Sequence, residues 1–171
     1  MPEGTSTSHA KQGLKASTSK NEAKQDAIQL LISDHKKVEE LFKQFQKAKK
    51  NDGDKAGIVK QICDALSVHA EIEEEIFYPA ARDALSDKGE DMLDEAEVEH
   101  ASIKSLVKQL EDADPDDDLY DAKVKVLCEY VTHHVKEEEG EMFPKVRKTN
   151  LDLEELGAEL MERKQELMEE E

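Results

Sequence analysis

Six side chains that can bind metal ions recur at one fixed interval along the chain. They are His35, His69, Glu73, His100, His134 and Glu138. Each of the first three lies 65 residues before its counterpart, since His35 corresponds to His100, His69 to His134 and Glu73 to Glu138. Neighbouring apolar residues repeat at the same interval, and so do Pro79 and Pro144. The sequence therefore contains two copies of one structural unit.

The residue types in this repeat predict a centre of two metal ions. A histidine and a glutamate four residues apart are about 40° apart around a helix, so both side chains can reach one centre. Burying an ionised carboxylate without a cation costs a large free energy, which favours metal ions beside Glu73 and Glu138. Imidazole and carboxylate without thiolate suit iron, manganese or zinc. If the two glutamates bridge, each ion takes two histidines and keeps open positions, which favours iron over zinc.

The apolar pattern around these residues predicts the helices that must position them. Apolar residues recur in steps of three and four from Asp26, from about Asp54, and from about Gly89 to Ala113. Asp114 followed by Pro115 predicts the start of the next helix, because an acidic cap often precedes a proline at the first helical position. The candidate ligands occupy the polar gaps in these apolar stripes.

Four helices with short connections predict an all-α, up-down-up-down four-helix bundle over residues 26–148. Residues 149–171 form a shorter amphipathic pattern, which we expect to be a fifth helix that caps the bundle or meets a partner, with capping favoured. Residues 1–25 are rich in Ser, Thr, Lys and Gly, so we expect a disordered tail.

Composition excludes several classes of partner. The chain of 171 residues carries 24 Lys and Arg against 42 Asp and Glu, a formal net charge of −18, so nucleic acid and anionic membranes would be repelled. No apolar run approaches the roughly 18 residues that span a membrane. Two cysteines and the lack of an export signal favour the cytoplasm. We expect a monomer or a weak homo-oligomer.

Each of four further residues has two possible roles. Tyr130 precedes His134 by four residues, so its phenol could lie beside the metal ions or simply pack in the core. His133 could act as an additional metal ligand, or it could have a supporting or surface role, which we favour. Cys63 and Cys128 could be inert buried thiols or redox sensors.

The pattern of His35, His69 with Glu73, His100, and His134 with Glu138 resembles the hemerythrin-like, or HHE cation-binding, family over about residues 26–148. The resemblance implies a non-haem di-iron centre, oxo- or hydroxo-bridged, with the histidines as terminal ligands and the glutamates as bridges. It also implies handling of dioxygen, peroxide or nitric oxide. Oxygen-carrying hemerythrins have a further histidine where this chain has Lys104, which favours redox turnover over reversible oxygen carriage.

The sequence thus leads to one main hypothesis and two alternatives. The main hypothesis is a di-iron protein that binds or reduces dioxygen, peroxide or nitric oxide in stress protection or sensing. The first alternative is an iron-binding protein that oxidises or senses iron. The second is a non-catalytic interaction module in which the metal ions only hold the helices together.

Overall fold

The computed structural model describes residues 24–170, and within this range the regular elements are all helical, without a β-strand. The elements are α1 (Ala27–Lys50), α2 (Lys55–Ile72), η1 (Glu73–Phe77), α3 (Tyr78–Leu85), η2 (Ser86–Lys88), α4 (Glu90–Glu111), α5 (Tyr120–Glu137), η3 (Glu138–Met142), α6 (Phe143–Arg147) and α7 (Leu153–Glu169). The segments η1 and η3 are π-helical, and η2 is a 3₁₀ turn.

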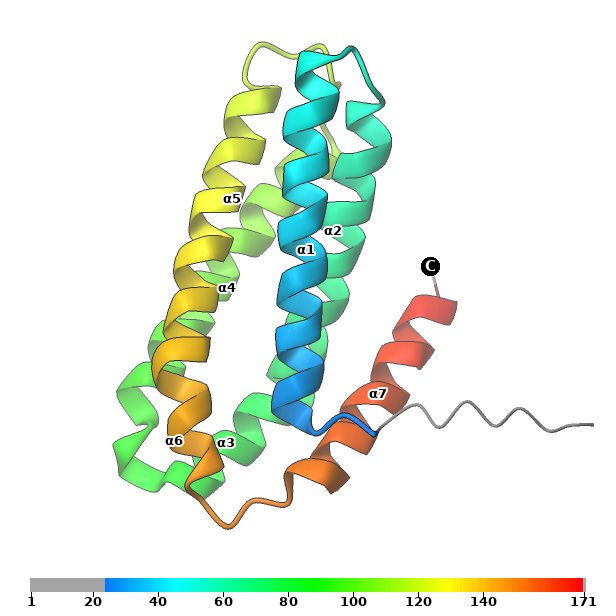
Figure 1. Cartoon of the computed structure of the whole chain (residues 1–171). Coiled ribbons are helices and arrows are strands. Elements are labelled where there is room, and N and C mark those ends of the chain that lie inside the picture. The colour runs from blue at the N-terminus through cyan, green and yellow to red at the C-terminus, as the bar shows by residue number, and fades with distance from the viewer. Residues whose placement is uncertain (1–23, 171) are drawn as a thin grey trace, which may run out of the picture.

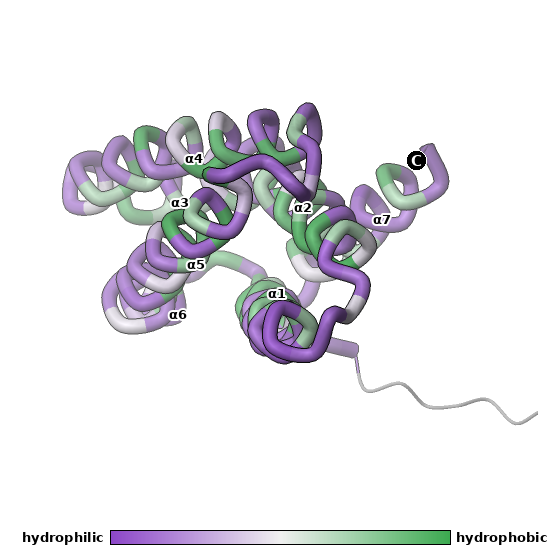
Figure 2. Tube along the Cα trace, turned by 90° about the horizontal axis from the view of Figure 1, so that it is seen from above, coloured by the Kyte–Doolittle hydropathy of each residue, from purple (hydrophilic) through white to green (hydrophobic). Residues whose placement is uncertain are grey.

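Helices α1, α2, α4 and α5 run alternately up and down along one axis, while α3 and α6 extend α2 and α5 at the lower end (Figure 1). Viewed along the axis, the hydrophobic stretches of the four helices concentrate on the sides that face one another (Figure 2). This arrangement confirms the predicted all-α bundle with a short C-terminal helix. The predicted disordered tail, residues 1–25, falls almost entirely outside the described residues.

Local capping explains where the first two helices begin. The Asp26 carboxylate accepts the Gln29 N–H and the Gln29 side chain accepts the Asp26 N–H, which makes a capping box at the start of α1. The Asp54 carboxylate accepts the Gly57 N–H at 2.9 Å at the start of α2. Both positions agree with the sequence prediction.

The predicted helix start at Asp114 and Pro115 was wrong, because α5 begins at Tyr120. The Asp114 carboxylate accepts the Asp116 N–H at 2.9 Å, and the Asp117 carboxylate accepts the Asp114 N–H at 3.1 Å. These bonds form a turn that uses the carboxylates locally, so they do not cap a helix. The signal was therefore that of a turn.

Two π-helical segments interrupt the second helix of each repeat at equivalent positions. Each begins at a candidate ligand, Glu73 or Glu138, and ends just before a residue pair that contains proline. The Tyr78 N–H bonds to the Glu73 carbonyl, and the Phe143 N–H bonds to the Glu138 carbonyl, each five residues back. Since proline donates no helical hydrogen bond and crowds the preceding turn, a wider turn is a natural accommodation.

The hydrophobic interior is divided into two clusters. The upper cluster includes Phe42, Phe45 and Leu127, and the lower cluster includes Leu31, Phe77 and Leu93 as well as residues of α7. The buried polar residues of the bundle lie between these clusters along the axis. Apolar packing above and below therefore holds the polar layer in place.

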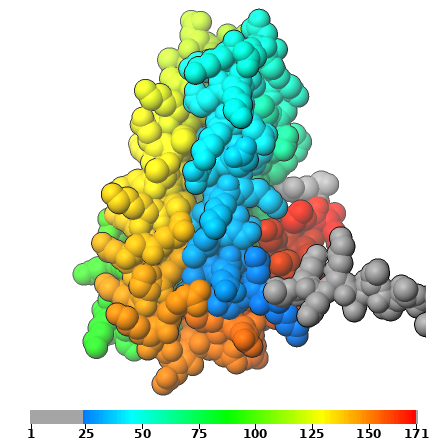
Figure 3. All heavy atoms as spheres, viewed as in Figure 1, coloured from blue at the N-terminus to red at the C-terminus, as the bar shows by residue number. Residues whose placement is uncertain are grey.

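Helix α7 packs across the lower part of α1 and α2, as predicted for a cap (Figures 1 and 3). Leu156 and Leu160 are buried in the lower cluster. Gly157 allows the close approach, because a Cβ atom there would lie 2.7 Å from the Gln25 carbonyl oxygen and 2.8 Å from the Ala27 nitrogen. Among the helices of residues 24–170, none combines the length and the apolar content needed to cross a membrane.

Candidate metal centre

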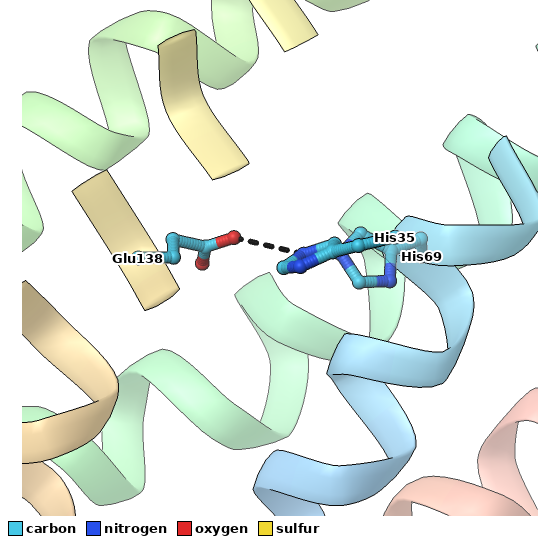
Figure 4. A group of neighbouring side chains, drawn as sticks. All are labelled: His35, His69 and Glu138. Atoms are coloured by element: carbon cyan, nitrogen blue, oxygen red, sulfur yellow. Dashed lines mark ion pairs between the residues drawn. The ribbon is translucent and has the colours of Figure 1, made fainter. Parts of the chain in front are cut away.

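The fold brings all six sequence-predicted metal-binding side chains into one buried layer. Two groups of three have ligand atoms that all lie within 4.8 Å of one another. One group contains His35, His69 and Glu138, and the other contains Glu73, His100 and His134. Figure 4 shows the first group, in which Glu138 reaches from η3 towards imidazoles of α1 and α2. Each group could hold one metal ion.

Each glutamate lies between the two pairs of histidines. The Glu73 Oε1 atom is 2.7 Å from His69 Nε2 and 3.7 Å from His100 Nε2. The Glu138 Oε1 atom is 3.2 Å from both His134 Nε2 and His35 Nε2. Both carboxylates are therefore positioned so that they could contact an ion in either group, which is the geometry that a bridging ligand needs.

The donor atoms fit metal ions better than they fit one another. His35 Nε2, His69 Nε2, both carboxylate oxygens of Glu73 and Glu138 Oε1 are buried and make no well-aligned hydrogen bond. Buried polar atoms normally have partners, so these unsatisfied atoms point to a ligand. His100 Nε2 and His134 Nε2 are 3.1 Å apart. Two nitrogens bound at about 2.1 Å and at right angles would be about 3 Å apart.

The other ring nitrogen of three of the four histidines bonds to a carboxylate, which fixes how the ring is oriented. Such pairing selects the Nδ1–H tautomer and leaves Nε2 free to bind a metal ion. The Nδ1 atoms and their partners are His69 with Asp34 at 3.1 Å, His134 with Glu99 at 3.0 Å, and His35 with Glu139 at 3.3 Å. The Nδ1 atom of His100 makes no hydrogen bond, and the nearest carboxylate, that of Glu74, lies 3.7 Å away. These carboxylates obey the same repeat, because Asp34 corresponds to Glu99 and Glu74 to Glu139.

Without a metal ion, the two glutamates differ in how readily they ionise. Burial raises the pKa of Glu73 well above its usual value, and the negative charge of Glu138 raises it further. Burial also opposes ionisation of Glu138, but its interactions with Glu73 and with the charge of His134 keep its pKa well below the usual range. A metal ion bound here would favour the ionised form of both carboxylates.

The two histidines of the second group share one proton. Burial and the neighbouring His134 lower the pKa of His100 to about 3. Burial opposes protonation of His134, but the adjacent Glu138 carboxylate raises its pKa to about 9. At neutral pH and without metal, His134 is therefore charged and His100 is neutral. Asp34 is ionised, because its bonds with His69 and Lys164 outweigh burial and lower its pKa.

Tyr78 joins this group, although the sequence analysis did not identify it. Its hydroxyl group lies 3.0 Å from His100 Nε2 and 3.2 Å from His134 Nε2, and donates to Glu138 Oε2 at 2.9 Å. Burial and the charges of Glu73 and Glu138 raise the pKa of Tyr78 well above its usual value, so the phenol keeps its proton. It is the candidate proton donor of the centre.

The π-helical turn explains why Tyr78 was missed. In an α-helix, Tyr78 would lie about 140° around the axis from Glu73, five residues earlier. The wider turn of η1 instead brings both side chains to the same face. The equivalent residue in the second repeat is Phe143, which stacks on His35 with ring centroids 5.9 Å apart. The centre is therefore asymmetric, with a phenol in one half and a phenyl ring in the other.

The remaining predicted residues lie away from the centre or behind it. Tyr130 is 46% exposed and lines a surface pocket with His133, so the structure does not bring it into the buried layer. His133 is exposed and lies 3.3 Å from Glu99, the carboxylate that holds His134. Cys63 is buried, and burial raises the pKa of its thiol to about 12. Burial also raises the pKa of Cys128, so neither thiol is activated.

A small cavity lies beside the four imidazoles. Its volume is about 30 Å³, and its other walls are mainly apolar, including Val38, Leu66, Ile103 and Val131. Since one water molecule needs about 10–15 Å³ by this kind of measure, the cavity accommodates a molecule of one or two heavy atoms. It is too small for an organic substrate.

Residues 26–146 match the model of the Hemerythrin HHE cation binding domain. The chain therefore belongs to the hemerythrin HHE family, whose domains bind cations. The chain is also similar in structure to a hemerythrin HHE cation binding domain-containing protein from Mycobacterium kansasii. The TM-score is 0.70 at 23% identity, and the match covers 84% of this chain and 87% of the other. That similarity supports the fold.

A curated relative from Nostoc sp. (strain PCC 7120), named DNA nickase, is 35% identical over 124 residues. The match covers 72% of this chain but only 33% of the relative, so the chain spans about a third of that protein's length. What the two proteins share is thus limited to this part of the relative.

Proposed function

We propose that the six buried side chains hold two iron ions, oxo- or hydroxo-bridged, and that the protein binds or reduces dioxygen, peroxide or nitric oxide in stress protection or sensing. The observation that carries the proposal is the set of unsatisfied buried nitrogen and oxygen atoms between the two hydrophobic clusters. Histidine and carboxylate donors without thiolate suit iron. In such a site, His35 and His69 would bind one ion, His100 and His134 the other, and Glu73 and Glu138 would bridge.

The residues around the centre support a small oxidant as the ligand. The cavity beside the imidazoles admits only a molecule of one or two heavy atoms, and its apolar walls exclude bulk water. Tyr78 holds a proton within 3.2 Å of two imidazole nitrogens. When bound, a pair of iron ions supplies the electrons for reduction, and Tyr78 is positioned to supply a proton to the reduced ligand.

The absence of a further histidine favours turnover over reversible carriage. Lys104 occupies the position where oxygen carriers have that ligand, and its ammonium group points to Glu74, on the outer side of the layer. Each ion would then have at most two histidines and two shared carboxylates, which leaves positions open on both ions. Such open positions would be suited to binding a small ligand that is reduced rather than carried.

The nickase activity named for the Nostoc relative is not extended to this chain. A net charge of −18 repels the phosphate backbone, on which most affinity for DNA depends. We propose instead that the partners are small molecules, and that the protein works as a monomer or weak homo-oligomer in the cytoplasm, where Cys63 and Cys128 remain free thiols.

The test is metal analysis of the whole chain, purified from iron-replete cells, and of the Glu73→Ala variant. We expect two irons per wild-type chain and loss of the pair in Glu73→Ala, because one bridging carboxylate is removed. Glu141→Ala is the matched control, since it removes an exposed glutamate from η3. Two irons retained in Glu73→Ala would refute the ligand assignment, and zinc or a single ion in the wild type would refute the di-iron proposal.

Iron-loaded protein then separates the main hypothesis from its alternatives. Reaction with peroxide or nitric oxide, followed by the change in the visible spectrum, supports redox handling of these ligands. Oxidation of added ferrous iron beyond two per chain would support iron handling instead. A metal-dependent fold that reacts with none of these would support the interaction module.

A further inference from the structure

Helix α7 reaches the metal layer through a part-buried ion pair. Lys164 of α7 donates to Asp34 Oδ1, and the side chains are 17% and 10% exposed. The other oxygen of Asp34 accepts from Nδ1 of His69 at 3.1 Å. A continuous chain of bonds therefore leads from α7 through α1 to an imidazole of α2.

This connection differs from its counterpart in the second repeat. Glu99 corresponds to Asp34 and holds His134, but the group on its far side is His133 of α5, the same helix that carries His134. Lys164 instead comes from a helix that lies outside both repeats and outside the matched residues 26–146. The two halves of the layer are thus supported by different elements, and the main contacts of α7 are with α1, α2 and η1.

The position of Asp34 has consequences for His69. An aspartate held by a lysine on one oxygen has little freedom to rotate, so its other oxygen fixes the direction of the imidazole ring. Carboxylates that hold metal-binding histidines in this way typically change metal affinity by about 10–100-fold when removed. A residue that holds such a carboxylate should have a smaller effect in the same direction.

We propose that Lys164 is a positioning residue for the metal centre, through which the docking of α7 sets the affinity of the ion held by His35 and His69. This inference rests on the proposed function, because it assumes that two ions bind. It predicts that the two sites are inequivalent, and that displacement of α7 weakens one of them selectively.

The experiment is an anaerobic titration of the whole metal-free chain with ferrous iron, which gives a dissociation constant for each of two ions. We expect Lys164→Met to weaken one ion by about 3–10-fold and to leave the other within about twofold. Lys164→Arg should restore the affinity, because arginine can also donate to Asp34. Asp34→Asn should weaken the same ion, and it tests the inference even if Lys164→Met folds poorly.

Arg163→Met is the matched control, because Arg163 also ties α7 to the bundle. Its guanidinium donates to Glu75 at 2.7 and 3.2 Å, but Glu75 holds none of the histidines. We expect Arg163→Met to lower the stability of the metal-free chain without changing either dissociation constant. Equal affinities in the wild type and Lys164→Met, or the same loss in Arg163→Met, would overturn the inference. Failure of the wild type to bind two ions would refute the proposed function itself.

Discussion

Replacing Tyr78 with phenylalanine removes one buried hydroxyl group and tests the geometry of the second half of the layer. The substitution keeps the ring, which is 2% exposed, and makes the position identical to its repeat counterpart, Phe143. The lost group donates to Glu138 at 2.9 Å and lies 3.0 and 3.2 Å from two imidazole nitrogens. No cavity larger than one oxygen atom is created.

The expected effect follows from the bond to Glu138. Hydrogen bonds to charged groups contribute about 1.5–3 kcal/mol, and the carboxylate that loses its donor stays buried. We therefore expect the free energy of unfolding of metal-free Tyr78→Phe to fall by about 1.5–3 kcal/mol. For a chain of this size, the unfolding temperature should fall by about 3–12 °C.

Urea unfolding of the metal-free chain, followed by circular dichroism, measures this change, and the slope with urea should stay the same. Tyr130→Phe is the control, because it removes the same group from an exposed position, and it should change stability by less than about 0.5 kcal/mol. An unchanged or raised stability of Tyr78→Phe would refute the reasoning that this hydroxyl satisfies a buried carboxylate. Equal losses in both variants would refute it as well.

Two further predictions concern the metal-free chain. Gly157→Ala should lower the free energy of unfolding by about 1–2 kcal/mol in urea unfolding, because the new methyl group would lie 2.7–2.8 Å from backbone atoms. Gly140→Ala is the control, because its methyl group meets nothing within 4 Å, and it should raise the free energy of unfolding by up to about 1 kcal/mol. Unchanged stability of Gly157→Ala would show that α7 docks less closely. Because the pKa of His134 is raised from 6.5 to about 9 in the folded chain, its protonation stabilises fully below pH 6.5, and that stability is lost as pH rises to about 9. His134→Gln should therefore remove part of the fall in unfolding temperature between these pH values, and an identical pH profile would contradict the assignment of the shared proton.

The sequence identified most residues of the buried polar layer because these residues recur at a fixed interval, which is visible without a structure. Equal intervals between His35 and His100, and between Glu73 and Glu138, indicate two equivalent helix pairs, and parallel helices place equivalent residues at the same height. The same interval would also have found Asp34 and Glu99, but an aspartate or glutamate on a helix with many charged residues carries no signal of its own. Their role is decided by the imidazoles that they face.

The errors in the sequence analysis have local causes. Tyr130 was expected either beside the centre or packed in the core, on the assumption of one regular helix face, yet that position of α5 faces solvent. Asp114 and Pro115 match the pattern of a helix start, but the hydrogen bonds of Asp114 with Asp116 and Asp117 form a turn instead. In each case, two local conformations satisfy the same short pattern, and the chain around it selects one.

The sequence by itself determined the helices, their order and six of the seven buried polar residues in the described range, because apolar periodicity and an internal repeat are properties of the chain alone. The tertiary structure decided which groups surround them. A π-helical turn brings Tyr78 to the face of Glu73, and the docking of α7 brings Lys164 to Asp34, 130 residues away in sequence. Contacts of this kind depend on how whole helices pack, and no periodicity within one helix encodes them.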